Sequence, residues 1–456
     1  MQYLLNIYDL LLPPIYLLVI YYLAKNFENR KKIYQPEYTY FTNGLMIRIV
    51  GAFSLGLIYF FYYDGGDTTN YYQTAEVFVK LFFKNTEFFF DALTNKDKVA
   101  TWSYFDENTG FPEYKRQDDY TYFVVKLMIP IVFLSGGSYF TSAIITATVT
   151  YFGIWKLYQV FISEYPSAKK LLAFGVLFFP SCVFWGSGIM KDSFTLSAIG
   201  WYTYGFYNLI IKKKYKVNYI SQLLISSFVI LSIKPYVFLA LLPGSLIWFG
   251  NDTAVKIKVA FFKLIFTPLL LAFSIGLSYF LITKLSDGLN SYNLDSIFER
   301  ATVVQKDMKA EYYGGKTFDI GEFEPTLAGV LGKTPIAVYS GLFRPAIWEV
   351  KNAVMLIAGL ENIFLLSLTL FLLYKAGPNK IFKILKTSPL IYFAIIFSII
   401  FSFSVGLTVA NFGSLVRLRI PELPFFVSSI LLLYHLTEQK SKNDNSIRIK
   451  EVVEAN

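Results

Sequence analysis

The chain has 456 residues, of which 55% are hydrophobic, 19% are aromatic and only 16% are charged, and its net charge is +10. Together with a mean hydropathy of +0.46, this composition excludes an ordinary soluble domain and predicts a protein of many membrane-spanning helices. The positive charge is largely accounted for by short basic loops, so it gives no support to nucleic-acid binding.

Apolar stretches long enough to cross about 30 Å of hydrocarbon recur along the whole chain. The first, at 4–24, lacks a basic leader and a small-residue cleavage site, so we expect a retained helix rather than a signal peptide. A tight pair of spans is expected at 218–250. The other candidate spans are 45–63, 139–163, 171–190, 193–211, 258–283, 350–374, 388–410 and 422–437.

The distribution of Lys and Arg predicts the orientation of these spans, because short cytoplasmic loops are rich in basic residues. In the long connections 64–119 and 284–349, by contrast, acids outnumber bases, and we expect both to lie outside. The basic loops, expected to be cytoplasmic, are 25–32, 212–216, 256–263 and 375–386.

The run 120–134 is short, contains Lys126 and ends at Ser-Gly-Gly-Ser. We interpret it as a re-entrant or tilted half-helix, which other helices must bury. The fold class that follows is an all-α integral membrane protein of about eleven crossings, with re-entrant or interfacial helices and two long outer loops. We expect one polytopic transmembrane domain over 1–437 and a short cytoplasmic tail over 438–456.

Charged residues interrupt the apolar runs at the ends that this orientation places outside. Asp64 and Asp67 flank two glycines in "YYDGGDTTNYY", where glycine lets the backbone turn tightly beside a ligand. The other charged positions expected on this face are Lys191, Asp192, Lys234, Arg344, Glu349, Arg417, Arg419 and Glu422.

Each position also has an ordinary structural explanation. Lys234 and Arg344 each precede a proline near a span end, where long cations reach for lipid headgroups. Asp-Gly sequences favour turns for local reasons, and an adjacent Lys-Asp pair suits a loop or a helix cap. Glu361 lies inside an apolar run and is expected to pair with a buried base such as Lys126 or Arg48.

The coincidence of these residues on one face favours a binding site over simple anchoring, because anchoring cations collect on the cytoplasmic side. Lys and Arg suit an anionic headgroup, above all phosphate or pyrophosphate. The chain has one cysteine, Cys182, and one histidine, His435, so a His/Cys metal cluster is excluded and no cofactor is expected. A general base on this face is therefore expected to be a carboxylate.

Five segments carry a resemblance to a known family: "GGDTTNYY", "FWGSGIMKD", "IKPY", "LFRPAIWE" and "NFGSLVRLRIPELPFF". Their layout resembles bacterial polysaccharide polymerases of the Wzy and EpsG type and, more loosely, the GT-C membrane glycosyltransferases. The resemblance implies undecaprenyl-pyrophosphate saccharides as substrates, on the outer face of the bacterial cytoplasmic membrane. It also implies polysaccharide-assembly proteins as partners.

For the site, the resemblance implies that Asp67, or Asp64 next best, acts as the base, and its position on the same face makes Asp192 a further catalytic candidate. It implies that Arg344, Arg417 and Arg419 handle the pyrophosphate, and the residues themselves add Lys191 and Lys234. We expect structural or orienting roles for Glu422, Glu349 and Glu361. The chain departs from GT-C enzymes in lacking an Asp-Glu pair in its first outer loop, which leaves dependence on a divalent metal open.

A flippase or other transporter of lipid-linked saccharides is the alternative, because it would also bind pyrophosphate and span the membrane many times. Transporters usually contain paired repeats and ionisable groups along a path near the midplane. This chain has no convincing repeat, and its charges gather at one rim, which favours an enzyme. The loop 284–349, with Tyr312 and Tyr313, is expected to close over the site and exclude water.

Overall fold

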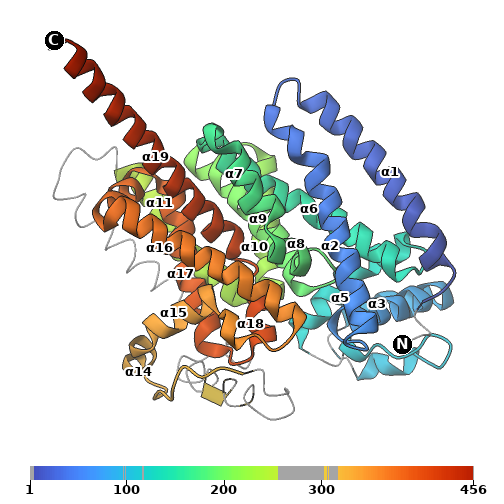
Figure 1. Cartoon of the computed structure of the whole chain (residues 1–456). Coiled ribbons are helices and arrows are strands. Elements are labelled where there is room, and N and C mark those ends of the chain that lie inside the picture. Colours follow the sequence, from blue (N-terminus) through green and yellow to red (C-terminus); the bar gives the residue numbers. More distant parts are fainter. Residues whose placement is uncertain are drawn as a thin grey trace. The chain divides into compact units, whose positions relative to one another are not determined.

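A computed structural model gives the fold (Figure 1). It describes residues 5–254 and 317–454, except 96, 98, 116 and 117, together with residues 302, 303, 305 and 307; at 251–254, 353, 354 and 440–454 it describes the backbone alone. The expected span 258–283, Tyr312, Tyr313 and most of the loop 284–349 lie outside the described residues. Within them the fold is all-α, as expected, and the only extended pairing is an isolated bridge between Thr317 and Asn411.

Four helical segments are long and apolar enough to cross a membrane: Tyr8–Lys31, Pro36–Phe61, Met355–Thr387 and Pro389–Thr408. A fifth span is possible where α5 (Asp119–Leu134) meets α6 (Tyr139–Glu164) in a bend of 114°, a broken span or a re-entrant loop. This bend agrees with the half-helix expected at 120–134. The protein is thus a helical membrane protein with four or five such helices among its described residues, and the expected count of about eleven is not supported.

The difference in span count has a physical cause in the breaks of the apolar runs. The run 171–190 divides into α7 (Lys169–Ala173), a π-helical turn (Phe174–Phe178) and α8 (Pro180–Trp185), because Pro180 removes a backbone donor. The run 218–250, expected as a pair of spans, does divide at Pro235 into α10 (Val217–Ile233) and α11 (Pro235–Ala254), but the apolar segments of both are shorter than those of the four long helices. The run 193–211 is the 16-residue α9 (Lys191–Phe206) followed by a π-helical turn (Tyr207–Ile211).

The chain divides into two compact units. The first unit contains residues 1–162, 177–209 and 214–235. In it α1 (Tyr8–Lys31) lies beside α2 (Phe41–Phe61), α2 packs on α8, and α9 packs on α10 (Figure 1).

The segment 64–119, expected to be a long loop, is largely helical. It forms α3 (Asp67–Lys84), α4 (Thr86–Thr94) and the 3-10 turns η3 (Ala100–Tyr104) and η4 (Glu113–Lys115). Asn85 and Asp118 cap α4 and α5 by accepting hydrogen bonds from backbone N–H groups three residues on. α3 packs along α5, so this segment is a folded, packed part of the first unit.

The second unit contains residues 163–176, 210–213 and 236–456. Its helices include α14 (Leu327–Gly332), α15 (Thr334–Phe343), α16 (Ala353–Thr387), α17 (Pro389–Thr408), α18 (Phe412–Leu418) and α19 (Leu423–Glu454). α15 and α17 approach closely because both carry glycine at the crossing: a Cβ on Gly406 would lie 2.0 Å from the Ala337 carbonyl oxygen. α19 begins at the expected span 422–437 and continues beyond residue 438 as one helix.

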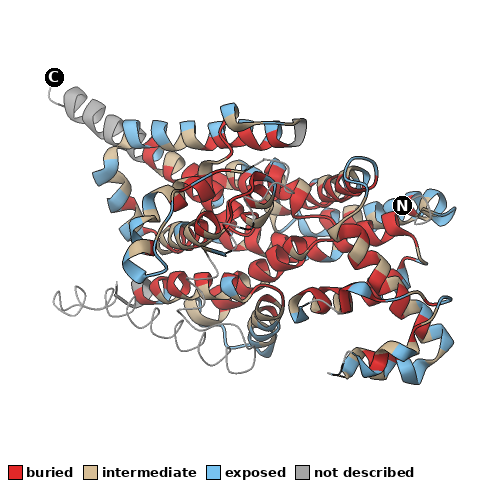
Figure 2. Ribbon diagram, turned by 90° about the horizontal axis from the view of Figure 1, so that it is seen from below, coloured by how far each residue is buried: buried red, intermediate tan, exposed pale blue. Residues whose placement is uncertain are grey.

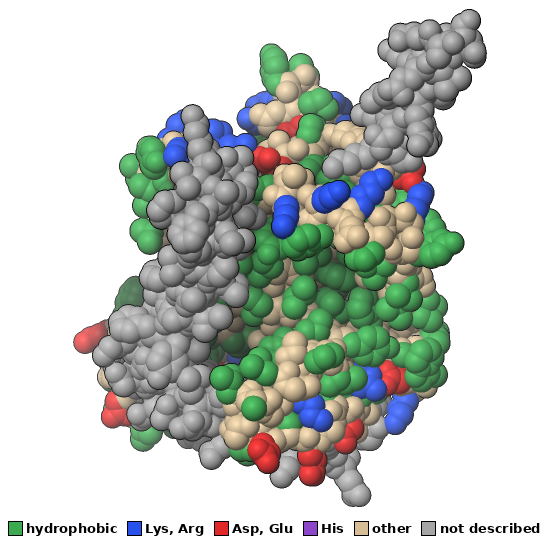
Figure 3. Space-filling view, turned by 90° about the vertical axis from the view of Figure 1, so that its left-hand side faces the viewer, with side chains coloured by type: hydrophobic (Ala, Val, Ile, Leu, Met, Phe, Trp, Pro, Cys, Tyr) green, Lys and Arg blue, Asp and Glu red, His purple; other side chains and the backbone are tan. Residues whose placement is uncertain are grey.

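Burial follows the pattern of a membrane protein. Figure 2 shows many helices with a buried side and an exposed or intermediate side. Only 11% of the residues in the most apolar stretch of α1 are buried, and Leu10, Leu18 and Leu23 are among its exposed residues. Figure 3 shows a face on which hydrophobic side chains cover much of the described surface, an arrangement suited to lipid.

Candidate functional site

The Asp-Gly-Gly-Asp turn directs Asp67 to the start of α3. Asp64, Gly65 and Gly66 all have positive φ, at 51°, 114° and 131°, which is why glycine occupies two of the three positions. The turn is closed by the Gly66 N–H, which donates to the Thr69 hydroxyl at 3.1 Å. Asp67 is therefore held at the first position of a helix, where the helix dipole favours a carboxylate.

Asp67 also has a partner that sequence reasoning missed. The Tyr114 hydroxyl donates to Asp67 Oδ1 at 3.0 Å, and the Asn70 amide donates to the same tyrosine oxygen at 3.2 Å. Tyr114 lies 47 residues away on η4 and its ring packs against Tyr71. Because the chain is so rich in tyrosine, no sequence signal singled this one out.

A buried ion pair lies at the start of α9. The Lys234 ammonium contacts Asp192 Oδ1, and the two side chains are only 6% and 2% exposed. Lys234 is the C-cap of α10 and Asp192 lies in the first turn of α9, so the pair joins the ends of two packed helices. A buried pair of this kind is costly to break and fixes the position of its neighbours.

Lys191 is the more accessible cation beside this pair, with 26% of its side chain exposed. Its ammonium donates to the Thr121 hydroxyl at 2.7 Å and lies 3.9 Å from Asp118. Burial and, less strongly, the charge of Lys234 lower the pKa of Lys191, while Asp118, Asp67 and Asp192 act in the opposite direction. The structure thus brings three predicted site residues, Asp67, Asp192 and Lys234, within electrostatic reach of a fourth, Lys191.

Asp118 and Thr121 are further members of this group that sequence reasoning missed. Burial acts to raise the pKa of Asp118, but hydrogen bonds from the Thr121 hydroxyl and N–H outweigh it and hold the pKa below its ordinary value. The sequence contained a usable signal, because "DDY" directly before an apolar run is typical of a helix start.

An apolar groove of about 660 Å³ lies among α5, α6, α9 and α10 in the same unit. On α9, Phe194, Ala198 and Trp201 line it, and their helical spacing places them on the face that Lys191 begins. Further apolar lining comes from Leu127, Pro130, Ile131, Leu134, Ile145, Val149, Ile225 and Val229. Lys191 does not itself line the groove, but it begins the α9 face that does, one turn before Phe194.

Arg48 fixes the turn that precedes Lys191. Its buried guanidinium donates to the Gly186 carbonyl at 2.6 Å and to the Ser187 hydroxyl at 3.3 Å. Lys126 lies 4.7 Å from the centre of the Tyr122 ring. Glu361 is buried in α16, and its expected pairing with Lys126 or Arg48 stays a prediction.

The predicted residues of the second unit form their own cluster. Arg344 pairs with Glu349 at 2.9 Å, donates to the Asp319 carbonyl at 3.4 Å and lies 4.9 Å from the centre of the Phe318 ring. Most of the Arg344 side chain is covered by these contacts, with 19% exposed.

Arg419 has a different environment from the one expected of a pyrophosphate ligand. It is fully buried, and it donates to the Leu342 carbonyl at 3.2 Å and the Arg344 carbonyl at 3.1 Å. Glu422, also buried, accepts a hydrogen bond of 2.6 Å from Ser402 and interacts with the charge of Arg419. This placement favours a structural role for Arg419, as expected for Glu422, while Arg417 is half-buried at the end of α18.

Comparison with known proteins assigns no family. No protein-family model, no curated protein and no solved structure matches the chain. The resemblance to polysaccharide polymerases therefore stays a prediction.

The geometry of the first unit defines the chemistry available. Among the described residues, no three His, Cys, Asp or Glu side chains lie close enough together to hold a metal ion. The unit combines an apolar groove with the Lys191 ammonium, which begins the α9 face that lines the groove and has the Asp67 carboxylate within electrostatic reach. Such a site suits an amphiphile with an anionic head and a hydrocarbon tail.

Proposed function

We propose that this protein is a membrane-embedded glycosyltransferase or polysaccharide polymerase. It transfers a saccharide from a polyprenyl phosphate or pyrophosphate donor to a glycan acceptor, on the outer face of a bacterial cytoplasmic membrane. The carrier lipid and the saccharide are its substrates, and other polysaccharide-assembly proteins are its partners.

One observation carries the proposal: the partly exposed Lys191 begins the helix face that lines the apolar groove. A free phosphate or a soluble nucleotide would need the cation but not the groove, and a plain hydrocarbon would need the groove but not the cation. A phosphorylated membrane lipid uses both. The buried Asp192–Lys234 pair fixes the start of α9 and so positions Lys191.

Asp67 is the proposed general base. It accepts the proton of the acceptor hydroxyl, whose oxygen forms a new bond to the anomeric carbon of the donor sugar. The bond from that carbon to the carrier phosphate breaks, and its electron pair remains on the phosphate oxygens, where Lys191 stabilises the added charge. The products are the extended glycan and the carrier phosphate, and the proton passes from Asp67 to solvent.

Residues of the second unit are also predicted to take part in substrate binding. Arg344 and Arg417 remain predicted ligands of the pyrophosphate. We assign Arg419 a structural role, because its guanidinium donates hydrogen bonds to backbone carbonyls in the loop 342–344. Asp64 is exposed and stays the second choice of base.

The experiment uses cells that make a surface glycan with this chain as the native protein. Asp67→Asn and Lys191→Ala are expected to abolish or strongly reduce polymer and to accumulate lipid-linked saccharide, at normal levels of the membrane protein. Lys212→Ala is the matched control, because Lys212 also forms an ion pair, with Glu164 at 2.7 Å, but follows the π-helical turn after α9, whereas Lys191 begins that helix.

Unchanged polymer in both site variants would reject the proposal. The leaflet that holds the accumulated saccharide separates transferase from flippase. A blocked transferase leaves the saccharide open to a membrane-impermeant oxidant added to spheroplasts, whereas a blocked flippase leaves it protected inside.

A further inference from the structure

A second, polar pocket lies in the segment between α3 and α5. Its volume is about 470 Å³, and one wall is the face of α3 that carries Asn70, Gln73 and Glu76. The opposite wall is the loop 107–113. The side chains that offer hydrogen bonds to its interior are Asn70, Gln73, Glu76, Glu107, Asn108 and Glu113.

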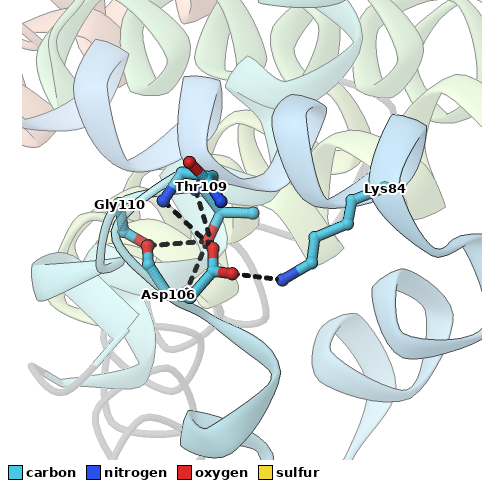
Figure 4. Close-up of polar contacts among 5 residues, drawn as sticks. Lys84, Asp106, Thr109 and Gly110 are labelled. Carbon is cyan, nitrogen blue, oxygen red and sulfur yellow. Dashed lines mark hydrogen bonds and ion pairs between the residues drawn. The ribbon is translucent and has the colours of Figure 1, made fainter.

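The loop wall is held in place by its own hydrogen bonds (Figure 4). Asp106 Oδ1 accepts from the Asn108 N–H at 3.2 Å and the Thr109 N–H at 3.0 Å, and Asp106 Oδ2 pairs with Lys84 at 2.6 Å. Gly110 has φ of 77°, and a Cβ there would lie 3.2 Å from Val77 on the α3 wall. A side chain at Gly110 would therefore crowd Val77, and the hydrogen bonds to Asp106 hold the loop beside α3.

Phe111 gives the pocket an aromatic wall. Its ring is stacked on Trp102, with centroids 5.7 Å apart and planes 17° from parallel, yet 47% of Phe111 is exposed. Stacking fixes the ring, and its exposed surface is available to the C–H face of a sugar.

The lining excludes three other kinds of ligand. Glu76, Glu107 and Glu113 outnumber the one lysine, Lys80, which pairs with Glu76 at 3.2 Å, so a phosphate or another anion is disfavoured. The described carboxylates form no metal-binding group. The density of polar side chains disfavours a lipid tail.

We propose that this pocket binds a neutral or amino-bearing saccharide of about one or two sugar residues. Amide and carboxylate side chains beside an aromatic ring match the hydroxyl groups and apolar faces of sugars. This binding proposal rests on the residues of the pocket and does not depend on the proposed function.

The pocket is also connected to the proposed base. Asn70 lines the pocket and donates to Tyr114, which donates to Asp67. A saccharide held there would lie beside the side chains that bind Asp67. We therefore assign the pocket to the acceptor glycan, an assignment that rests on the proposed function.

The experiment measures binding of glucose, galactose and N-acetylglucosamine by saturation-transfer NMR, with the full chain in lipid nanodiscs free of sugar detergents. At least one sugar is expected to bind, and Gln73→Ala and Phe111→Ala are each expected to weaken it about fivefold or more. Ser103→Ala is the control, because Ser103 is exposed on η3 and does not line the pocket.

Absence of binding by all three sugars, or equal binding by wild type and both pocket variants, would overturn the inference. The acceptor assignment has its own readout in cells: Gln73→Ala is expected to shorten the polymer, and normal chain length would overturn that assignment. If the sugar binds but Asp67→Asn and Lys191→Ala both leave the polymer unchanged, the proposed function fails while the saccharide pocket stands.

Discussion

The lysines of the first unit differ in what surrounds their ammonium groups, and this difference separates their roles. Lys234 is buried against Asp192, whereas Lys84 is exposed and pairs with Asp106 at 2.6 Å. Lys191 is partly exposed, with a hydroxyl and several carboxylates nearby. Of these three, Lys191 is the one that is partly exposed and begins the helix face that lines the apolar groove.

The Lys84–Asp106 pair gives a pH-dependent prediction. The hydrogen bond from Lys84, followed by the one from the Thr109 N–H, lowers the pKa of Asp106 to about 2. Because this pKa is depressed, the stabilisation of the loop is complete above about pH 4, the ordinary value for Asp, and is lost as the pH falls through about 2. We expect Lys84→Met to move this loss upward toward pH 4.

The measurement is hydrogen exchange of the peptide covering 105–111, corrected for intrinsic rates, between pH 2 and pH 7. Lys212→Met serves as the control and should leave the transition where it is in the wild type. An identical midpoint in Lys84→Met and wild type would show that this ion pair does not set the stability of the loop.

At the scale of helices, glycine determines how closely α6 and α9 approach. A Cβ at Gly200 of α9 would lie 1.9 Å from the carbonyl oxygen of Gly153 on α6, and one at Gly153 would lie 2.0 Å from the Ser197 carbonyl oxygen. Both contacts are to backbone, which cannot rotate away as a side chain does. Since α6 and α9 both line the apolar groove, this crossing also sets the groove's width.

Gly200→Ala is therefore expected to destabilise the protein by about 1–3 kcal/mol, despite the better helix propensity of alanine. In thermal unfolding of the full chain this should appear as a fall in Tm of several degrees. Gly332→Ala is the matched control, because a Cβ there would meet no atom within 4 Å. Equal Tm for Gly200→Ala and wild type would contradict the close helix crossing.

At the scale of the whole molecule, composition was enough to predict a helical membrane protein, and the four long apolar helices agree with it. The number of spans could not be predicted in the same way. Hydropathy alone does not show that Pro180 removes a backbone donor, or that π-helical turns lie beside α8 and α9.

The site was predicted in part for a similar reason. Charges at span ends are visible in sequence, and this identified Lys191, Asp192, Lys234 and Asp67. Burial cannot be recognised from a charged residue's position in the sequence, so the fully buried Arg419 was predicted to bind an anion. The partners Asp118 and Tyr114, the apolar groove and the polar pocket depend on tertiary packing among α3, α5, α6, α9 and α10, which no single segment encodes.

In the proposed function, the groove and Lys191 together hold a phosphorylated lipid. The most direct measurement uses a polyprenyl pyrophosphate with a photoactivatable diazirine in its isoprenoid tail, added to the full chain in vesicles. We predict labelling of the α9 and α10 peptides around Phe194–Trp201 and Ile225–Val229, competed by undecaprenyl pyrophosphate but not by undecaprenol. Labelling should fall about tenfold in Lys191→Ala, the loss expected for one charge-assisted hydrogen bond, and remain in Lys212→Ala. Labelling confined to the exposed apolar surfaces of α1 and α16, without competition and without loss in Lys191→Ala, would contradict the account.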